Sequence, residues 1–509
     1  MPLSIASTLV FPTTVLHALE IGDLLMTFVP GEACVEIGLE LRKRALARGY
    51  AAQFTVGLSN DYLAYFVPPE YYSRLHYETA SNFYGPGMME WFCRQFSKLM
   101  TRGKPEPERP IPEPAVVSEV EGGVRCTLSG DPYTMGYQRG AAFKDDINGV
   151  YATRLVAPMD EGKLKPSSEI WKYLEVAHLD ASPLLLFAMA MGVRPQMQGL
   201  SIETVDELRG MADGAGMPFD ALWMVQCASI ISAQPKTDMF YRAPICTMFA
   251  TTGDRAGADD VLVGRNLDWN AGEKPVIVEM RPASGRTFVQ VGFPWNAGVF
   301  TGMNDAGLVL CAERVESLGI PPIDGAPVEF VMREILKKEE SVAAAVTRLQ
   351  ACTTLRGYHV LVAGFNQPVS PPPEREKGRD RKRPVAKVPA KPGGAACIVE
   401  FGPSIGVRHP DKGLLLGVDP AVAKEEDAKT RYGRVAQLAG DEHIVGEAKI
   451  ETILADHESG KSEPACIWNE HTRHSVVFGP SARKLHVAFP NEKGVPGSYV
   501  TVSVKGGAS

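Results

Sequence analysis

Cys246 places a thiol among residues that could make it a nucleophile. It lies in RAPICTMFATTG, and Arg265 and Asp268 follow it within DDVLVGRNLDW. A cut between Ile245 and Cys246 would give this cysteine a free α-amine. The ordinary pKa is about 7.7–8.0 for an α-amine and about 8.5 for a thiol, so the amine can accept the thiol proton near neutral pH. Such chemistry needs no histidine base.

Arg265 and Asp268 would serve this nucleophile in different ways. The guanidinium of Arg265 would favour the thiolate, and the carboxylate of Asp268 would hold and orient the new α-ammonium. Residues three apart do not share a face of an ideal strand, so we expect a bend at Asn266 and Leu267 to turn both side chains inward. A second interpretation stays open, in which RNLDW is a strand end with an ordinary ion pair.

The elements that would position these residues indicate an α+β fold. We predict strands after position 246 because β-branched and aromatic residues recur between Gly, Pro or Asn. The segments are VLVGRNLDW, KPVIVEMRP, TFVQVGFPW, GLVLCAERV, YHVLVAGF, ACIVEFG, HSVVFG, KLHVAF and SYVTVSV. Helices are predicted from Ser201, closed by GAGMP, and from Pro327, which is followed by Val328, Val331 and Ile335 on one face.

Two stretches poor in apolar residues divide the chain. Residues 104–115 (KPEPERPIPEPA) are typical of an extended linker. Residues 367–394 combine Pro, Lys and Arg and cannot bury enough surface to offset their ordering entropy, which predicts a mobile insert. The remainder is predicted to comprise a first unit at 1–103, a helical part at 116–245 and a strand-rich part at 246–509.

Composition limits the partners and the compartment. The 509 residues carry a net charge of −7, which gives no general attraction to nucleic acid or anionic membranes. Nine cysteines without a C-x-x-C motif predict neither a disulfide framework nor a structural zinc site. No stretch approaches the roughly 20 apolar residues that span a bilayer, and we expect no secretory signal. We therefore expect a cytoplasmic protein without a cofactor.

Residues from about 119 to 495 resemble the acyl-coenzyme A:6-aminopenicillanic-acid acyltransferase family. The matching motifs, in order, are LSGDPYTMGYQRG (128–140), DELRGMADGAGMP (206–218), CTMFAT, GRNLDW, GMNDAGLVL (302–310), KTRYGRVAQL (429–438) and ILADHESG with CIWNEHTRHSVVFGPSARKLHVAF. Their order is more specific than any single motif. The resemblance implies an N-terminal-nucleophile (Ntn) hydrolase domain at 116–509, an αββα four-layer sandwich related to penicillin V acylases, bile salt hydrolases and acid ceramidase.

The resemblance also implies roles for matched residues. Cys246 is the nucleophile, with Arg265 and Asp268 as its partners, and Arg431 anchors the site by pairing with carboxylates. Backbone N–H groups near two residues of the strand after GMNDAGL would face the oxyanion. These residues are Glu313 and Arg314.

Asp419 departs from the family pattern. The family places an asparagine in a T-N-H stretch after its G-x-L strand, whereas GLLLGVDP places Asp419 there. An ionised aspartate only accepts hydrogen bonds and would repel a developing oxyanion. Three interpretations remain: the alignment slips by a few residues, burial keeps Asp419 protonated, or the activity is weak or altered.

Aromatic and histidine side chains near these motifs have other interpretations. Trp269, Phe293 and Trp295 would line an acyl pocket or pack in the core. His471 and His474 precede a strand without a carboxylate ligand motif and are interpreted as loop residues rather than metal ligands.

Residues 8–100 resemble the later part of the catalytic domain of neutral or alkaline ceramidases. We expect them to form a small α/β fragment before the Ntn domain. The matches are ALEIGDLLMTFVPGE, EIGLELRKRALARG and GLSNDYLAYFVPPEYYSRLHYETASNFYGP. In that family a glutamate and a tyrosine from these motifs bind zinc with two histidines from an earlier region. The matching positions are Glu32 and Tyr65, and two oxygen ligands without imidazoles make a poor zinc site.

Three functions stay in competition. The first is a cysteine amidohydrolase or acyltransferase that cleaves an N-acyl bond of a small molecule, with N-acyl lipids such as ceramides favoured, and whose self-cleaved chains stay associated. The second is a zinc hydrolase of the neutral ceramidase kind, completed by another chain. The third is a catalytically weak Ntn-fold binding protein, for which Asp419 and the shortened ceramidase-like part at the front are the arguments.

Overall fold

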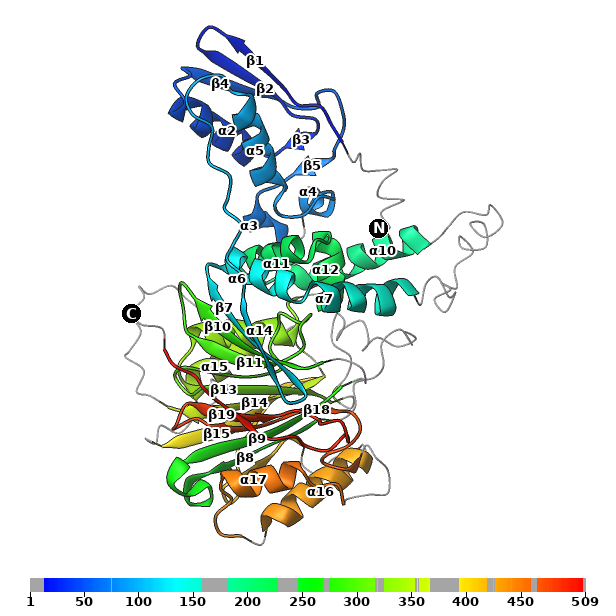
Figure 1. Ribbon diagram of the computed structural model, residues 1–509, viewed down its shortest axis with the longest axis vertical. Coiled ribbons are helices and arrows are strands. Elements are labelled where there is room, and N and C mark those ends of the chain that lie inside the picture. Colours follow the sequence, from blue (N-terminus) through cyan, green and yellow to red (C-terminus); the bar gives the residue numbers. More distant parts are fainter. Residues whose placement is uncertain are drawn as a thin grey trace, which may run out of the picture.

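The computed structural model describes residues 13–506, apart from 75, 158–181, 228–245, 270–273, 316–317, 319–324, 353–354, 356, 367–392, 419–423, 425, 441 and 459–464. Its helices and sheets form the predicted α+β fold (Figure 1). Asp419, Ile245 and nearly all of the predicted insert lie outside the described residues. Gly394, the last residue of that insert, begins a strand.

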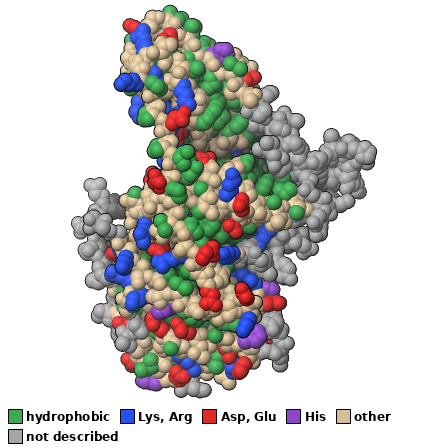
Figure 2. Space-filling model, in the orientation of Figure 1, with side chains coloured by type: hydrophobic (Ala, Val, Ile, Leu, Met, Phe, Trp, Pro, Cys, Tyr) green, Lys and Arg blue, Asp and Glu red, His purple; other side chains and the backbone are tan. Residues whose placement is uncertain are grey.

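Residues 13–103 form the part that we call the N-terminal module. One sheet has the order β1–β2–β4, and β3 pairs with β5 in a second. The bounds are β1 His17–Ile21, β2 Leu24–Phe28, β3 Glu32–Ala33, α2 Val35–Ala47, β4 Ala52–Val56, β5 Tyr65–Phe66, α3 Pro69–Tyr72, α4 Tyr77–Ala80 and α5 Met88–Leu99. Ile37, Leu41, Phe66, Phe92 and Phe96 form its core. Figure 2 shows hydrophobic side chains gathered on the surface of this module.

A nine-stranded sheet crosses the rest of the molecule in the order β16–β15–β14–β13–β12–β11–β10–β7–β6. Its strands are β6 Val116–Val120, β7 Gly123–Gly130, β10 Val276–Pro282, β11 Phe288–Gly292, β12 Thr301–Asn304, β13 Val309–Arg314, β14 Tyr358–Phe365, β15 Gly394–Phe401 and β16 Ile405–Arg408. The prediction that 116–245 is helical is wrong for β6 and β7. Gly122 at positive φ turns this hairpin, and β-branched Val116 and Val117 were the overlooked strand signal.

A second sheet of six strands has the order β17–β8–β9–β18–β19–β20. Its strands are β8 Thr247–Thr252, β9 Val261–Asp268, β17 Leu414–Leu416, β18 Thr472–Gly479, β19 Lys484–Ala488 and β20 Val500–Ser503. Neighbouring strands in this sheet are antiparallel. A hydrophobic core that includes Met248, Val263, Ile277, Val309 and Val476 joins it to the nine-stranded sheet.

Helices cover the outer faces of both sheets. The nine-stranded sheet packs against α6 Pro132–Ala142, α7 Lys144–Val150, α10 Ser182–Val193, α11 Ile202–Ala215, α12 Phe219–Gln226, α14 Val328–Lys338 and α15 Val342–Gln350. The six-stranded sheet packs against α16 Glu426–Gly440 and α17 Glu447–Leu454. The layers therefore follow the predicted αββα order (Figure 1). Every segment predicted as a strand after position 246 contains one, and both predicted helices form.

The helices α6 and α11 touch backbone to backbone, which explains two of the glycine motifs. A Cβ on Gly136 would lie 1.8 Å from the carbonyl oxygen of Glu207, and one on Gly214 would lie 2.3 Å from that of Tyr137. Gly140 and Gly210 are equally closed. Because no side chain fits, glycine at these positions sets the spacing of the helical layer. Ser201 caps α11 through the backbone N–H of Thr204, as its sequence predicts.

Residues 104–115 contain neither helix nor strand, in keeping with the expected linker, and the domain division stays a prediction. In the part of the chain that the structure describes, no helix has the length and apolar character needed to cross a membrane.

Candidate active site

Cys246 lies directly before β8, beside the end of β9. Strand β8 pairs with β9 so that Thr247 faces Asn266, which brings the preceding cysteine close to Asp268. The Sγ atom of Cys246 contacts the backbone oxygen of Asp268 at 3.9 Å. The cysteine is buried with 7% of its surface exposed. Two residues from different parts of the sequence motif thus meet at one end of the six-stranded sheet.

The carboxylate of Asp268 is fully buried and accepts three hydrogen bonds. Its Oδ2 accepts from Arg431 Nη1 at 2.9 Å and from Asn469 Nδ2 at 2.7 Å, and its Oδ1 accepts from Thr472 Oγ1 at 2.9 Å. Arg431 is itself fully buried, so the two charges compensate each other away from water. This network fixes the Asp268 side chain at the residue whose backbone oxygen contacts the thiol, and it pairs Arg431 with a carboxylate.

Arg265 approaches the thiol from the other face of β9. Its Nη2 donates to the backbone oxygen of Ala312 on β13 at 2.6 Å, whereas Asp268 faces α16 through Arg431. The expected bend that turns Arg265 and Asp268 to one side is therefore wrong. Strand β9 pairs with β8 without a register shift, so its side chains alternate, and Cys246 lies at the end of the strand, where both faces can be reached.

Several charges act on the Cys246 thiol. Burial raises its pKa most, Arg265 opposes this by favouring the thiolate, and Asp268 and Glu313 raise the pKa further. At neutral pH the thiol is therefore protonated in the uncut chain. It needs a base to become a nucleophile, and no described histidine forms a hydrogen bond with its sulfur.

Tyr432 and Glu313 form a second polar cluster that sequence reasoning missed. The hydroxyl of Tyr432 donates to Glu313 Oε2 at 2.7 Å and accepts from the backbone N–H of Met248 at 3.1 Å. Burial, followed by the nearby Glu313 carboxylate, raises the pKa of Tyr432 far above its ordinary value. A Cβ on Gly417 would lie 2.3 Å from this hydroxyl, so the loop after β17 closes the cluster. The pair fixes the start of β8 and therefore the cysteine before it.

The two backbone donors expected on β13 point in opposite directions. The N–H of Ala312 donates to Phe300 on the β12 side, and that of Val315 donates toward the β14 side. Because N–H groups alternate along a strand, the backbone N–H of Glu313 points to β14. The backbone N–H of Arg314 points to the opposite side, as that of Ala312 does. Of the two expected donors, Arg314 is the one whose N–H leaves the β13–β14 ladder. The side chain of Glu313, in contrast, reaches the site.

His474 is part of the core, and its interpretation as a loop residue is wrong. It lies on β18, fully buried, with Nε2 at 3.1 Å from Thr301 Oγ1. Burial and the charge of Arg265 lower its pKa far below the ordinary value of a histidine. The imidazole is therefore neutral at pH 7. His471 lies in the turn before β18, as expected.

Aromatic rings gather around Trp269, the residue that follows Asp268. The ring of Trp269 lies 5.7 Å from Phe293, 6.3 Å from Trp295 and 6.2 Å from Phe300. Arg139 anchors their loop by donating to the backbone oxygens of Phe293 and Pro294, each at 3.0 Å. Cys246, Trp269, Phe293 and Trp295 all belong to the large hydrophobic core between the nine-stranded sheet and its helices, and Phe300 packs against that core. Both predicted roles, acyl pocket and core, remain compatible with this position.

Glu32 and Tyr65 lie side by side in the N-terminal module. They are direct partners in the parallel pair β3–β5. Tyr62 donates to Glu32 Oε1 at 2.8 Å, and a hydrogen bond to Glu32 raises the pKa of Tyr65. Across the described residues no group of three or more His, Cys, Asp and Glu side chains could hold a metal ion.

Comparison with known sequences gives partial matches. No protein-family profile matches the chain. An uncharacterized protein from Archaeoglobus fulgidus is 23% identical over 245 residues, which are 44% of this chain and 38% of that protein. The neutral ceramidase of Drosophila pseudoobscura pseudoobscura is 33% identical over 110 residues, and neutral ceramidase 3 of Arabidopsis thaliana is 38% identical over 88 residues. These matches cover 20% and 16% of this chain and 16% and 12% of the relatives. The chain thus spans well under half the length of each relative.

Solved structures with some likeness include three hydrolases. A Caenorhabditis elegans N-acylethanolamine-hydrolyzing acid amidase ortholog has a TM-score of 0.33 at 15% identity, over 46% of this chain and 93% of its own. A conjugated bile acid hydrolase mutant from Clostridium perfringens has a TM-score of 0.33 at 11% identity, over 51% and 92%. Penicillin V acylase from Agrobacterium tumefaciens has 0.32 at 14% identity, over 48% and 83%.

Proposed function

We propose that this chain is an Ntn-type cysteine amidohydrolase or acyltransferase that acts on an N-acyl bond. Cys246 is the nucleophile, and cleavage between Ile245 and Cys246 exposes its α-amine. The observation that carries the proposal is the contact of the buried thiol with Asp268, whose carboxylate is held by Arg431, Asn469 and Thr472. A carboxylate fixed there is suited to hold an α-ammonium.

The first half-reaction transfers the acyl group to sulfur. The α-amine takes the Sγ proton, and Sγ attacks the acyl carbon to form a tetrahedral oxyanion. Collapse breaks the C–N bond, and the leaving amine receives the proton from the α-ammonium, so charge and protons balance. Backbone N–H donors near Arg314 would stabilise the oxyanion. Arg265 steadies the thiolate during attack.

The second half-reaction releases the acyl group. Water, or an amine in a transferase, loses a proton to the α-amine and attacks the thioester carbon. The C–S bond breaks, and the proton returns to sulfur, giving a free acid or a new amide. The residue that restrains the α-amine is again Asp268.

We propose an N-acyl lipid as the substrate class. The aromatic cluster of Trp269, Phe293, Trp295 and Phe300 supports an apolar acyl group beside Cys246. The partial similarity to neutral ceramidases supports an amide of a long-chain acid.

Intact-mass measurement of the purified protein tests the proposal. We expect two chains, residues 1–245 and 246–509, and an uncut chain for Cys246→Ala. A thioester trapped at low pH in the wild type would identify the acyl group. Conservative Cys227→Ala, which removes a different buried thiol, is the matched control and should be cut normally. A wild-type chain that stays uncut, and whose Cys246 is not alkylated while the protein is folded, would contradict the proposal.

The second candidate is a zinc hydrolase whose remaining ligands come from another chain. The observation in its favour is the direct pairing of Glu32 with Tyr65 on β3 and β5. Stoichiometric zinc, together with an activity that EDTA abolishes and Cys246→Ala preserves, would favour it over the cysteine mechanism.

A further inference from the structure

Strand β4 forms a free edge of the three-stranded sheet in the N-terminal module. The sheet order β1–β2–β4 leaves one side of β4 without a partner strand among the described residues. Figure 1 places this sheet at the end of the module away from the helical layer. The sequence of β4, AQFTV, contains no charged residue and no proline, which are the residues that commonly keep an edge strand from pairing. This edge is therefore open to a further strand.

The backbone of β4 offers its unpaired groups at two positions. The N–H of Val29, just after β2, donates to the backbone oxygen of Val56 at 2.8 Å, so the backbone of Val56 faces the β2 side. Because backbone groups alternate along a strand, Phe54 also faces β2, whereas Gln53 and Thr55 turn their N–H and C=O groups to the free edge. The edge thus presents two donors and two acceptors, placed evenly on either side of Phe54.

A groove of about 690 Å³ lies between this edge and helix α2. A Cβ on Gly38 of α2 would lie 3.5 Å from Thr55 Oγ1, so the helix passes close to the strand. Four apolar residues that line the groove keep between 58% and 69% of their surface exposed, namely Val35, Leu39, Phe54 and Leu58. A single chain leaves this apolar surface in water, whereas a strand added to β4 would cover part of it.

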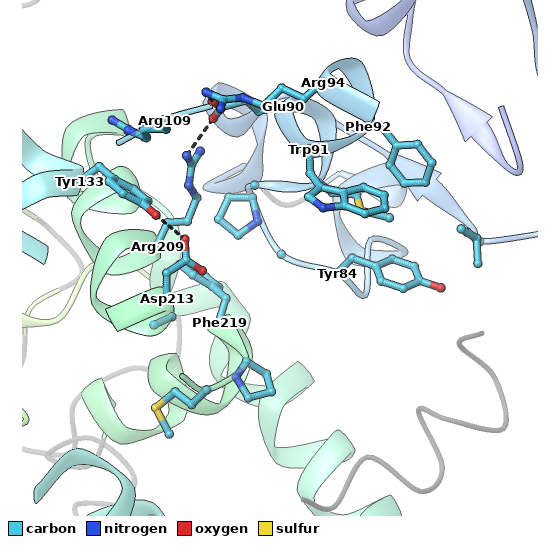
Figure 3. A pocket seen from close by; sticks show the side chains of 18 of the residues that line it. Tyr84, Glu90, Trp91, Phe92, Arg94, Arg109, Tyr133, Arg209, Asp213 and Phe219 are labelled. Atoms are coloured by element: carbon cyan, nitrogen blue, oxygen red, sulfur yellow. Dashed lines mark hydrogen bonds and ion pairs between the residues drawn. The ribbon is translucent and has the colours of Figure 1, made fainter. Parts of the chain in front are cut away.

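The other face of the module is already occupied. A larger cleft separates the module from the helical layer, and its charges compensate each other, since Arg94 and Arg209 share the carboxylate of Glu90 at 2.6 and 2.8 Å (Figure 3). The pair of Arg209 with Glu90 joins α11 to α5. The module is thus attached to the rest of the chain on this side, and its open surface is the β4 edge.

We propose that two copies of this chain associate through β4, so that their sheets continue across a two-fold axis at Phe54. In an antiparallel pairing centred there, Gln53 of each copy exchanges two backbone hydrogen bonds with Thr55 of the other. Each unpaired backbone group of the edge then gains a partner. The two Phe54 side chains lie side by side as a non-hydrogen-bonded pair, and aromatic pairs at such positions stabilise antiparallel strands.

Charge favours a second copy over an unrelated strand. The N–H of Leu58 donates to the backbone oxygen of Gly31, which places Glu32 near the end of β4. Arg42 lines the same groove further along α2, toward the start of β4. An antiparallel two-fold arrangement therefore brings Arg42 of each copy toward Glu32 of the other. Within one copy, neither side chain forms an ion pair with a residue that the structure describes, so the two charges remain available to complement each other.

Sedimentation velocity of full-length Cys246→Ala tests the proposal, because this variant removes self-cleavage as a cause of altered mass. We expect a reversible equilibrium between monomer and dimer. Phe54→Lys should raise the dimer Kd at least about tenfold, since it places two like charges beside the axis. Ile21→Lys is the matched control, because Ile21 is 58% exposed on β1, at the other edge of the same sheet, and it should leave Kd unchanged.

Two further measurements distinguish this dimer from any other contact. Arg42→Glu and Glu32→Arg should each weaken the dimer, and the double variant should restore it, because reversing both charges recovers the attraction between the copies. Residue-resolved hydrogen exchange should show the N–H groups of Gln53 and Thr55 protected only at concentrations where the dimer forms. The N–H of Phe54, which faces β2, should be protected at all concentrations.

Three results would overturn the proposal. The first is a folded Cys246→Ala protein that stays monomeric at every concentration, with folding judged by its thermal transition. The second is a dimer that Phe54→Lys leaves intact, or whose Gln53 and Thr55 amides exchange as fast as in the monomer. The third is a double charge variant that dimerises as weakly as its single parents. None of these results bears on whether Cys246 is cut or acylated, so this proposal and the proposed amide cleavage fail separately.

Discussion

The Cys246 centre and the Glu32–Tyr65 pair both match motifs of enzymes, but they differ in how the fold treats their charges. Asp268 is fully buried and has three hydrogen-bond donors from α16, the loop before β18 and β18 itself. Glu32 is partly exposed, and it forms hydrogen bonds with two tyrosines of its own module, Tyr62 and Tyr65. A buried carboxylate without such donors would cost several kcal/mol, whereas an exposed one needs none.

This difference distinguishes the Cys246 centre, which the fold builds around a buried charge, from the Glu32–Tyr65 pair, which only matches a motif. The fold tolerates the buried negative charge of Asp268 because its three donors compensate that charge, so loss of any donor is expected to destabilise the site next to Cys246. The pairing of Glu32 with Tyr65 would persist on the surface without any ligand. Burial around the cysteine raises the pKa of the Cys246 thiol and lowers the pKa of His474.

The largest expected effect compares Cys246→Ala with Glu32→Gln. We expect hydrolysis of an N-lauroyl arylamide to fall by on the order of 10⁴-fold or more in Cys246→Ala, because the covalent intermediate cannot form. Glu32→Gln should retain its rate within about twofold, as expected for a surface substitution remote from the reaction. The initial rate of arylamine release measures both. The reverse result would transfer the chemistry to the N-terminal module.

The next effect is on stability and compares a buried ion pair with an exposed one. Arg431→Met strands the Asp268 carboxylate in the interior, which should cost about 3–5 kcal/mol of unfolding free energy. Lys98→Met breaks a surface pair with Glu108 and should cost less than about 1 kcal/mol. Urea denaturation in the uncut Cys246→Ala background measures the difference.

A double variant isolates the stranded charge. Adding Asp268→Asn to Arg431→Met removes the negative charge and keeps one amide oxygen, which can accept from Asn469 or from Thr472, since these two donors bond different oxygens of the carboxylate. The double variant should therefore be more stable than Arg431→Met alone. Equal stability of the two would mean that lost packing of Arg431, rather than the uncompensated charge, sets the cost.

The strands and helices around Cys246 could be predicted from the sequence better than the side-chain contacts between them. Strand β9 and helix α11 were found because β-branched runs, the Ser201 cap and the closing glycine act locally. The strands β6 and β7 were missed because helical motifs follow them at once. The second partner of β7, the strand β10, lies some 150 residues further along the chain.

The partners of Asp268 could not be predicted in this way. Asn469 and Thr472 belong to a polar stretch typical of any turn, and only the pairing of β18 with β9 brings them to the carboxylate. Tyr432 follows Arg431 in a recognised motif, but its bond to Glu313 depends on two layers meeting. The direction of Arg265 was misjudged because strand alternation was considered without the position of Cys246 at the strand end.

A third prediction uses the buried His474. Its folded pKa lies far below that of an exposed histidine, about 6.5, so only the unfolded chain gains this proton as the pH falls below that value. The stability from this group is present above pH 6.5 and is lost toward lower pH, by up to about 1.4 kcal/mol per unit. Urea midpoints between pH 7 and 5 should therefore fall less steeply in His474→Gln than in its parent.

The exposed His17 in the N-terminal module supplies the control for this comparison. His17→Gln removes an exposed imidazole on β1 and is measured beside His474→Gln as the control for an ordinary His→Gln substitution. Parallel slopes for His474→Gln and its parent would show that His474 takes up a proton inside the fold, where Arg265 opposes it.

The smallest effect is expected at Tyr65. Tyr65→Phe removes the hydroxyl that bonds Glu32 at a partly exposed position, and surface changes of this kind usually alter stability by no more than about 0.5 kcal/mol. Without imidazole ligands the pair should hold no stoichiometric zinc after dialysis against buffer, in wild type or variant. Elemental analysis beside urea denaturation checks both statements. Zinc that is retained by the wild type and lost in Tyr65→Phe would erase the contrast between the regions, since an open surface would then hold a metal as firmly as the interior holds Asp268.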